Sequence, residues 1–150
     1  MRRIPLPLIG LMAVAVVAGL LFIANYEERA AEEDAIEARV GGHTLYMLIA
    51  DEADERTRGL SGRDGLEQDT GMLFIFDSDG RHGIWMKEMR FAIDILWLDR
   101  DGKVVFVRED IGPETYPTVF LPDVSARYVV EMVAGSVGRL GIQRGHSFDF

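Results

Sequence analysis

The sequence predicts a mainly β (α+β) fold: a small antiparallel β-barrel with one or two short helices, preceded by a single N-terminal transmembrane helix. The first observation is an uninterrupted apolar segment at residues 4–24. The second is a series of short apolar runs after residue 39, separated by turn residues at near-regular spacing, which is typical of antiparallel strands. A closed barrel suits these strands because closure removes exposed sheet edges.

The segment at residues 4–24 reads IPLPLIGLMAVAVVAGLLFIA and contains no charged side chain. About 20 apolar residues form a helix long enough to cross the hydrocarbon core of a bilayer. Arg2 and Arg3 precede the segment and acidic residues follow it, so the positive-inside rule places residues 1–3 in the cytoplasm. We therefore expect a signal-anchor in the cell membrane, single-pass, with the lipid bilayer as a partner and the domain on the extracytoplasmic side, periplasmic or outer. A cleaved signal peptide and a buried soluble helix are the alternatives.

Charge and composition argue against several classes of function. The chain has 25 acidic and 16 basic residues and a net charge of −9, and the phosphate backbone of nucleic acids repels an acidic protein. We expect no nucleic-acid partner. The chain has no cysteine, which excludes disulfides, thiol nucleophiles and thiolate metal ligands. The three histidines are far apart and no dinucleotide fingerprint occurs, so we expect no metal and no cofactor.

The chain after the apolar segment divides into a spacer and a domain. Residues 25–38, NYEERAAEEDAIEA, are rich in glutamate and alanine and have no broad apolar stripe. They predict an acidic, solvated spacer that holds the domain away from the bilayer. The extracytoplasmic β-barrel domain is expected at residues 39–150.

Within the domain, the apolar run at residues 44–50 predicts a strand buried on both faces. Residues 50–60 predict a helix that has Asp51 as its N-cap and ends at Gly59. Residues 93–99 and 103–109 flank a short turn and predict a hairpin. The other predictions are strands at 71–76, 84–89 and 127–135, a turn at 77–80, a proline-containing loop at 111–124 and one helical turn at 136–142.

Charged residues inside apolar runs are candidate site residues. Residues 84–98, IWMKEMRFAIDILWL, place Lys87 and Asp94 among aromatic and aliphatic side chains, and Glu131 interrupts the run VVEMV. We expect two neighbouring strands here, joined near residues 90–91. Alternation along the second strand puts Asp94 on the same face as Leu96 and Leu98. Because a buried charge is costly without a partner, these groups form either a functional site or buried pairs.

Three arginines form a second candidate site. Arg56, Arg58 and Arg63 lie near the predicted end of the helix. They either interact with the helix dipole and nearby acids or form a clamp for an anion, because a guanidinium binds carboxylate or phosphate with two hydrogen bonds. Both interpretations stay open, and the sequence mechanics favour the structural one.

Five stretches occur in an order that resembles a known family. They are RTRGLSGR (56–63), GMLFIF (71–76), IWMK (84–87), IDILWLD with DGKV (93–104) and YVVEMVAG (128–135). From about residue 42 to residue 150, the chain resembles the domain of unknown function 192 family. The resemblance implies a compact, mostly β domain with a short helix, often exported or membrane-anchored, without an established biochemical role. Where the family usually has Asn-Thr after Trp-Met-Lys, this chain has Glu88 and Met89, which matters if that pair binds a ligand.

Three hypotheses about function follow from these observations. We favour a non-enzymatic, membrane-anchored envelope module that binds a small anion or an envelope protein. The second hypothesis is an envelope enzyme that uses Lys87, Asp94 and Glu131 as acid or base. In the third, the charges are purely structural. The candidate binding residues are Arg56, Arg63, Trp85, Lys87, Asp94 and Glu131.

Overall fold

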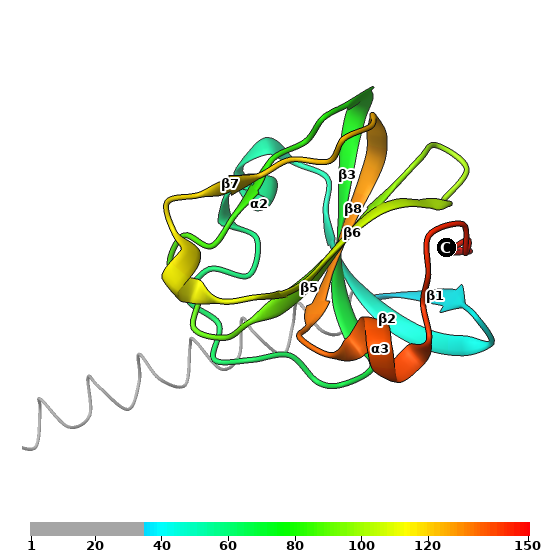
Figure 1. The fold of residues 1–150 in the computed structure, drawn as a ribbon, viewed down its shortest axis with the longest axis horizontal. Coiled ribbons are helices and arrows are strands. Elements are labelled where there is room, and N and C mark those ends of the chain that lie inside the picture. The colour runs from blue at the N-terminus through cyan, green and yellow to red at the C-terminus, as the bar shows by residue number, and fades with distance from the viewer. Residues whose placement is uncertain (1–34) are drawn as a thin grey trace, which may run out of the picture. The chain divides into compact units, whose positions relative to one another are not determined.

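The computed structural model describes residues 35–150, which form one compact unit of mainly β structure with two short α-helices (Figure 1). A six-stranded sheet has the order β1-β2-β3-β8-β5-β6, and β4 and β7 pair in a second, two-stranded sheet. The strands are β1 (Ile36–Val40), β2 (His43–Ala50), β3 (Thr70–Gly80), β4 (Ile84–Trp85), β5 (Ile93–Leu98), β6 (Val104–Ile111), β7 (Val119–Phe120) and β8 (Ala126–Val133). The helices are α2 (Ala53–Arg58), the 3-10 turn η1 (Pro113–Thr115) and α3 (Ser136–Leu140).

The predicted closed antiparallel barrel is wrong in two respects. Strands β1 and β6 are the two edges of the large sheet and do not pair with each other, and β2 and β3 pair in parallel. The parallel pair arises because α2 and the following loop carry the chain back to the start of the sheet before β3 begins. The C-terminal segment bonds to both edges instead: Arg39 exchanges two backbone hydrogen bonds with Asp149, and Val104 N donates to His146 O at 2.8 Å. These bonds satisfy edge groups without barrel closure.

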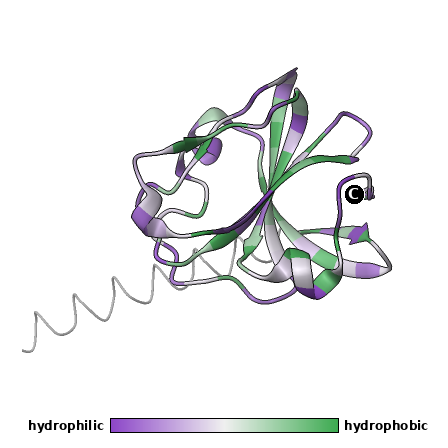
Figure 2. Cartoon of the chain, in the orientation of Figure 1, coloured by the Kyte–Doolittle hydropathy of each residue, from purple (hydrophilic) through white to green (hydrophobic). Residues whose placement is uncertain are grey.

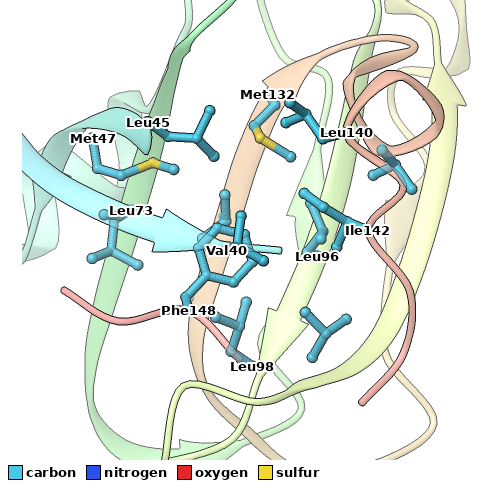
Figure 3. Close-up of a cluster of buried hydrophobic side chains, with 14 residues drawn as sticks. Val40, Leu45, Met47, Leu73, Leu96, Leu98, Met132, Leu140, Ile142 and Phe148 are labelled. Carbon is cyan, nitrogen blue, oxygen red and sulfur yellow. The ribbon is translucent and has the colours of Figure 1, made fainter. Parts of the chain in front are cut away.

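Two clusters of buried apolar side chains cover the two faces of the large sheet. The first includes Leu45, Met47, Leu96 and Met132 and extends to α3 and the C-terminal segment through residues such as Phe148 (Figure 3). Strand β2 contributes residues to both clusters. Its second half is buried on both faces as predicted, whereas Thr44 and Tyr46 in its first half are exposed. Figure 2 shows that the strands carry both hydrophobic and hydrophilic positions.

The second cluster covers the opposite face and supports the candidate site. It includes Phe74 of β3, Ile95 and Trp97 of β5, Leu60 from the loop after α2, and Ile84 of β4. The indole nitrogen of Trp97 donates to the carbonyl of His82 at 2.8 Å. The buried tryptophan thus fixes the segment that leads into β4, because its N–H needs a partner in a dry environment.

Local predictions were confirmed for several elements and wrong for others. The hairpin of β5 and β6 and the short helix at 136–140 are present. Residues 77–80 continue β3 to Gly80, so the predicted turn is wrong. The strand expected at 84–89 ends at Trp85, and it pairs with β7 rather than with β5. Helix α2 has Glu52, not Asp51, as its N-cap, in a capping box with Glu55, an arrangement that satisfies two free backbone donors.

The expected transmembrane segment at 4–24 and most of the expected spacer at 25–38 lie outside the described residues. Residues 36–38, which the sequence assigned to the spacer, form part of β1 and pair with β2. Within residues 35–150, no helix has the length and apolar character needed to cross a membrane.

Candidate functional site

A small cavity lies where helix α2, strand β4 and strand β8 meet. Residues 56–61 line it on one side, residues 83–85 and Met89 on another, and Phe74 and Glu131 come from the large sheet. Its volume is about 40 Å³, compared with about 30 Å³ for the share of one molecule in liquid water. The cavity can therefore hold a water molecule or a terminal functional group, but not a whole metabolite.

Glu131 is the buried polar group of this cavity. It lies on β8 opposite Met72 of β3 and Ile95 of β5, so the second apolar cluster surrounds it. The residue is only 4% exposed, and its carboxyl group has no hydrogen-bond or ion-pair partner among residues 35–150. Burial raises the pKa of Glu131 to about 8, because a low-dielectric environment disfavours the charged form. At neutral pH the group is mainly a neutral carboxylic acid that can both donate and accept a hydrogen bond.

Two arginines of α2 border the cavity, and they differ in how they are held. The Arg56 guanidinium donates to the backbone carbonyls of Asp51 and, at 2.9 Å, of Ile75. It also lies 5.4 Å from the centre of the Phe76 ring. Arg56 therefore fastens α2 to β3. Arg58 is exposed and has no ion-pair or hydrogen-bond partner for its side chain within the described part of the chain, so its charge remains available to a ligand.

Trp85 lies at the exposed edge of the cavity. It is 43% exposed, its ring packs edge-on against Tyr116 with centroids 6.3 Å apart, and Lys87 Nζ lies 5.8 Å from the ring centroid. Val119, which pairs with Trp85, and Leu121 are also exposed. We call Trp85, Tyr116, Val119 and Leu121 the β4–β7 patch.

Glu88, the residue after Lys87, shapes the backbone of the turn that follows β4. Glu88 has a φ of 56°, in the left-handed region that asparagine adopts more readily than most residues. Its carbonyl accepts a hydrogen bond from Gly62 N at 2.9 Å, and the Lys87 carbonyl accepts one from Ser61 Oγ at 2.7 Å. These bonds join the loop after α2 to the turn after β4. The backbone thus gives a reason for asparagine in the family's usual Asn-Thr pair, namely the shape of this turn.

The structure brings together some of the sequence-predicted site residues and separates others. Arg56, Trp85 and Glu131 line the cavity, and Lys87 is adjacent to it through Trp85. Arg63 is half-buried and does not line it. Arg58, which the candidate set left out, does line it; its place beside Gly59 at the helix end was the available signal.

Asp94 lies on the other face of the sheet, where it has a structural role. As alternation predicted, it shares a face with Leu96 and Leu98, which belong to the first apolar cluster. Its carboxylate is fully buried and accepts hydrogen bonds from Asp110 N at 3.0 Å and from Val137 N at 2.9 Å. Asp94 thus holds the irregular end of β6 and the first turn of α3. Because Glu131 faces the opposite side, the hypothetical acid–base cluster of Lys87, Asp94 and Glu131 is not assembled.

Among residues 35–150, no three histidine or carboxylate side chains come together in a way that could hold a metal ion. Residues 35–150 thus form one compact β unit that carries a small, partly open cavity. Over residues 36–150 the chain matches the model of the domain of unknown function 192 family, described as uncharacterized ACR, and it belongs to that family.

Two solved structures are similar to the chain. One, from Sinorhizobium meliloti and provisionally titled a transcription regulator, is 29% identical with a TM-score of 0.72, and the match covers 75% of this chain and 91% of that one. The other, a protein of unknown function from Novosphingobium aromaticivorans, is 23% identical with a TM-score of 0.73, covering 77% and 85%. No curated protein matches the chain.

Proposed function

We propose that the chain is a membrane-tethered, extracytoplasmic binding module, not an enzyme, and that its cavity receives a small anionic group such as a carboxylate. The observation that carries the proposal is Glu131: a buried carboxyl group without a partner in the described domain, lining a cavity that Arg58 borders. A carboxyl group that lines a partly open cavity and has no protein partner within residues 35–150 forms its hydrogen bonds there with water or with a ligand atom.

The charges of the cavity favour an anion over a cation. Arg56 and Arg58 are positive, whereas Glu131 is mainly neutral at pH 7 because its pKa is raised to about 8. A neutral carboxylic acid donates a strong hydrogen bond to an anionic oxygen, and the Arg58 guanidinium supplies charge-assisted bonds. A cation would meet two like charges and would first have to ionise Glu131. Of the three arginines considered for an anion clamp from the sequence, Arg56 and Arg58 line the cavity and Arg63 does not.

Two other functions have less support. Catalysis by Lys87, Asp94 and Glu131 is not what we propose, because Asp94 is engaged in two backbone hydrogen bonds on the far face of the sheet. The S. meliloti relative is titled as a regulator of transcription, but this chain carries 25 acidic against 16 basic residues, which opposes contact with nucleic acid. The proposed extracytoplasmic location of the domain rests on the apolar segment at 4–24 and the two arginines that precede it.

The test uses the full chain in nanodiscs of zwitterionic lipid and acetate as the probe, with binding followed by ligand-observed NMR. We expect Arg58→Ala to weaken acetate binding on the order of tenfold, as loss of a charge-assisted bond does. The matched control is Arg144→Ala, because Arg144 is also exposed and lies outside the cavity. It should leave the affinity unchanged.

The pH dependence separates this site from nonspecific attraction to arginine. Since the pKa of Glu131 is about 8, the affinity of the wild-type chain should fall roughly thirtyfold between about pH 6 and about pH 9.5 as the group ionises. Glu131→Gln cannot ionise and should bind acetate nearly equally at both pH values. An affinity for acetate that changes neither with Arg58→Ala nor with pH would contradict the proposal.

A further inference from the structure

The β4–β7 patch and the cavity form one continuous surface, because Trp85 belongs to both. All four side chains of the patch are large, apolar or aromatic, and exposed. Trp85 is in edge contact with Tyr116 and lies opposite Val119 in the strand pair. Exposed apolar residues gathered beside a polar pocket are typical of a binding surface rather than of an ordinary protein exterior.

Strand β4 also has an unused edge. It pairs only with β7, through Ile84 opposite Phe120 and Trp85 opposite Val119. Within the described residues, no backbone hydrogen bond links Ile84 or Trp85 to any segment other than β7. In an antiparallel pair, successive residues direct their backbone groups alternately toward and away from the partner. One residue of β4 therefore presents a free N–H and C=O to the side away from β7.

We propose that this surface binds an extended peptide that ends in a carboxylate: the terminal carboxylate enters the cavity between Arg58 and Glu131, and the preceding apolar residues lie along β4 and the β4–β7 patch. This inference rests on the proposed function, which supplies the anion site. The cavity of about 40 Å³ accepts a terminal group only, so the rest of the ligand must lie outside it. Capture of a chain terminus and addition of a strand to a free sheet edge are both established ways to bind a peptide.

The free edge of β4 favours a peptide over a fatty acid. Both carry a carboxylate next to apolar atoms, and both would cover Trp85 and Val119. Only a peptide has backbone groups that can pair with the free N–H and C=O of β4, whereas an acyl chain would cover these groups and leave them without partners. Covering a polar group in this way is unfavourable.

The experiment compares probes on the full chain in zwitterionic nanodiscs, by calorimetric titration. The probes are acetate, hexanoate, an acetylated pentapeptide of alternating threonine and valine with a free carboxylate, its terminal carboxamide, and a version with methylated backbone nitrogens. We expect the carboxylate peptide to bind at least about tenfold tighter than acetate. The carboxamide, the methylated peptide and hexanoate should each lose most of that gain.

A paired variant tests the patch without touching the cavity. Val119→Thr combined with Leu121→Ser keeps exposed side chains at positions that do not line the cavity. The double variant should bind the peptide about tenfold more weakly than the wild type, as loss of interface contacts does. Its affinity for acetate should stay within about twofold of the wild-type value.

The outcomes separate the two proposals. If acetate binds with the expected dependence on Arg58 and pH but the peptide binds no tighter, the peptide inference is overturned and the anion site stands. Hexanoate binding as tightly as the peptide would identify an acyl acid as the occupant and also overturn the inference. If the carboxamide and carboxylate peptides bind equally, the terminal carboxylate does not enter the cavity and the peptide inference is overturned, whereas failure of acetate to bind with the expected dependence on Arg58 and pH refutes the proposed function.

Discussion

Replacing Glu131 by glutamine should stabilise the domain relative to the wild type above about pH 4.5, by an amount that grows until about pH 8. Glutamine has nearly the same shape and cannot ionise. In the unfolded chain the carboxyl group titrates near its ordinary pKa of 4.5, whereas burial raises the pKa in the folded domain to about 8. Between these values the folded state holds a proton that the unfolded state has released. The stability that this proton confers is therefore complete below about pH 4.5 and is lost as the pH rises.

The magnitude follows from the separation of the two pKa values, about 3.5 pH units. Each unit corresponds to about 1.4 kcal/mol of unfolding free energy. The wild-type domain should thus lose on the order of 5 kcal/mol relative to the variant between about pH 4.5 and about pH 8. That is comparable with the whole stability of many small domains, about 5–15 kcal/mol, so the effect should be large enough to measure.

The assay is urea unfolding of the full chain at a series of pH values, followed by tryptophan fluorescence. The chain contains two tryptophans, Trp85 and Trp97, and both lie in the described domain, so the signal reports on its unfolding. Glu109→Gln, at an exposed position of β6, is the matched control and should follow the wild type at every pH. A constant difference between wild type and Glu131→Gln from about pH 5 to about pH 9 would refute the argument from burial.

Four further substitutions test hydrogen bonds and packing in the domain. Asp94→Ala removes the acceptor of two backbone N–H groups and should lower the unfolding free energy by about 3 kcal/mol or more, measured by urea unfolding; an unchanged midpoint would contradict the role of Asp94. Arg56→Ala should lower the free energy of unfolding by about 1–2 kcal/mol, because two backbone carbonyls lose their donor. Arg58→Ala should change it by no more than about 0.5 kcal/mol. Equal effects of the two substitutions in calorimetric melting would contradict the different roles of these arginines. Gly71→Ala would place a Cβ 2.9 Å from the Glu131 carbonyl oxygen and from Met47 Sδ, so thermal unfolding should reveal about 1–3 kcal/mol of destabilisation from overpacking; a neutral effect would mean that the two strands can separate slightly.

Local patterns in the sequence predicted most elements of the domain because short-range physics determines them. The hairpin of β5 and β6 follows from two apolar runs around a turn in which Asp99 Oδ1 accepts from the backbone N–H groups of Asp101 and Lys103, both at 3.0 Å. Alternation along β5 placed Asp94 on the correct face. Gly59 marked the end of α2. Each of these depends on residues only a few positions apart, whose preferences are present in the chain before it folds.

The candidate site could be predicted only in part. Glu131 and Arg56 stood out because a charge in an apolar run needs an explanation, and both line the cavity. Their environments were not predictable, because the partners of Arg56 include a carbonyl 19 residues away on β3. Glu131 owes its raised pKa to side chains from several strands and loops. Sequence also suggested that Asp94 and Glu131 act together, but strand pairing placed them on opposite faces.

The sequence by itself determined the family, the mainly β composition, the acidic charge and the residues that alternate between the two faces of each strand. Only the tertiary structure decided that the large sheet stays open, that β2 and β3 run parallel and that β4 pairs with β7. The physical reason is the range of the interactions. Alternation and turn chemistry act between near neighbours, whereas the C-terminal segment that bonds to both sheet edges, through Arg39 with Asp149 and Val104 with His146, joins residues that only the complete fold brings together.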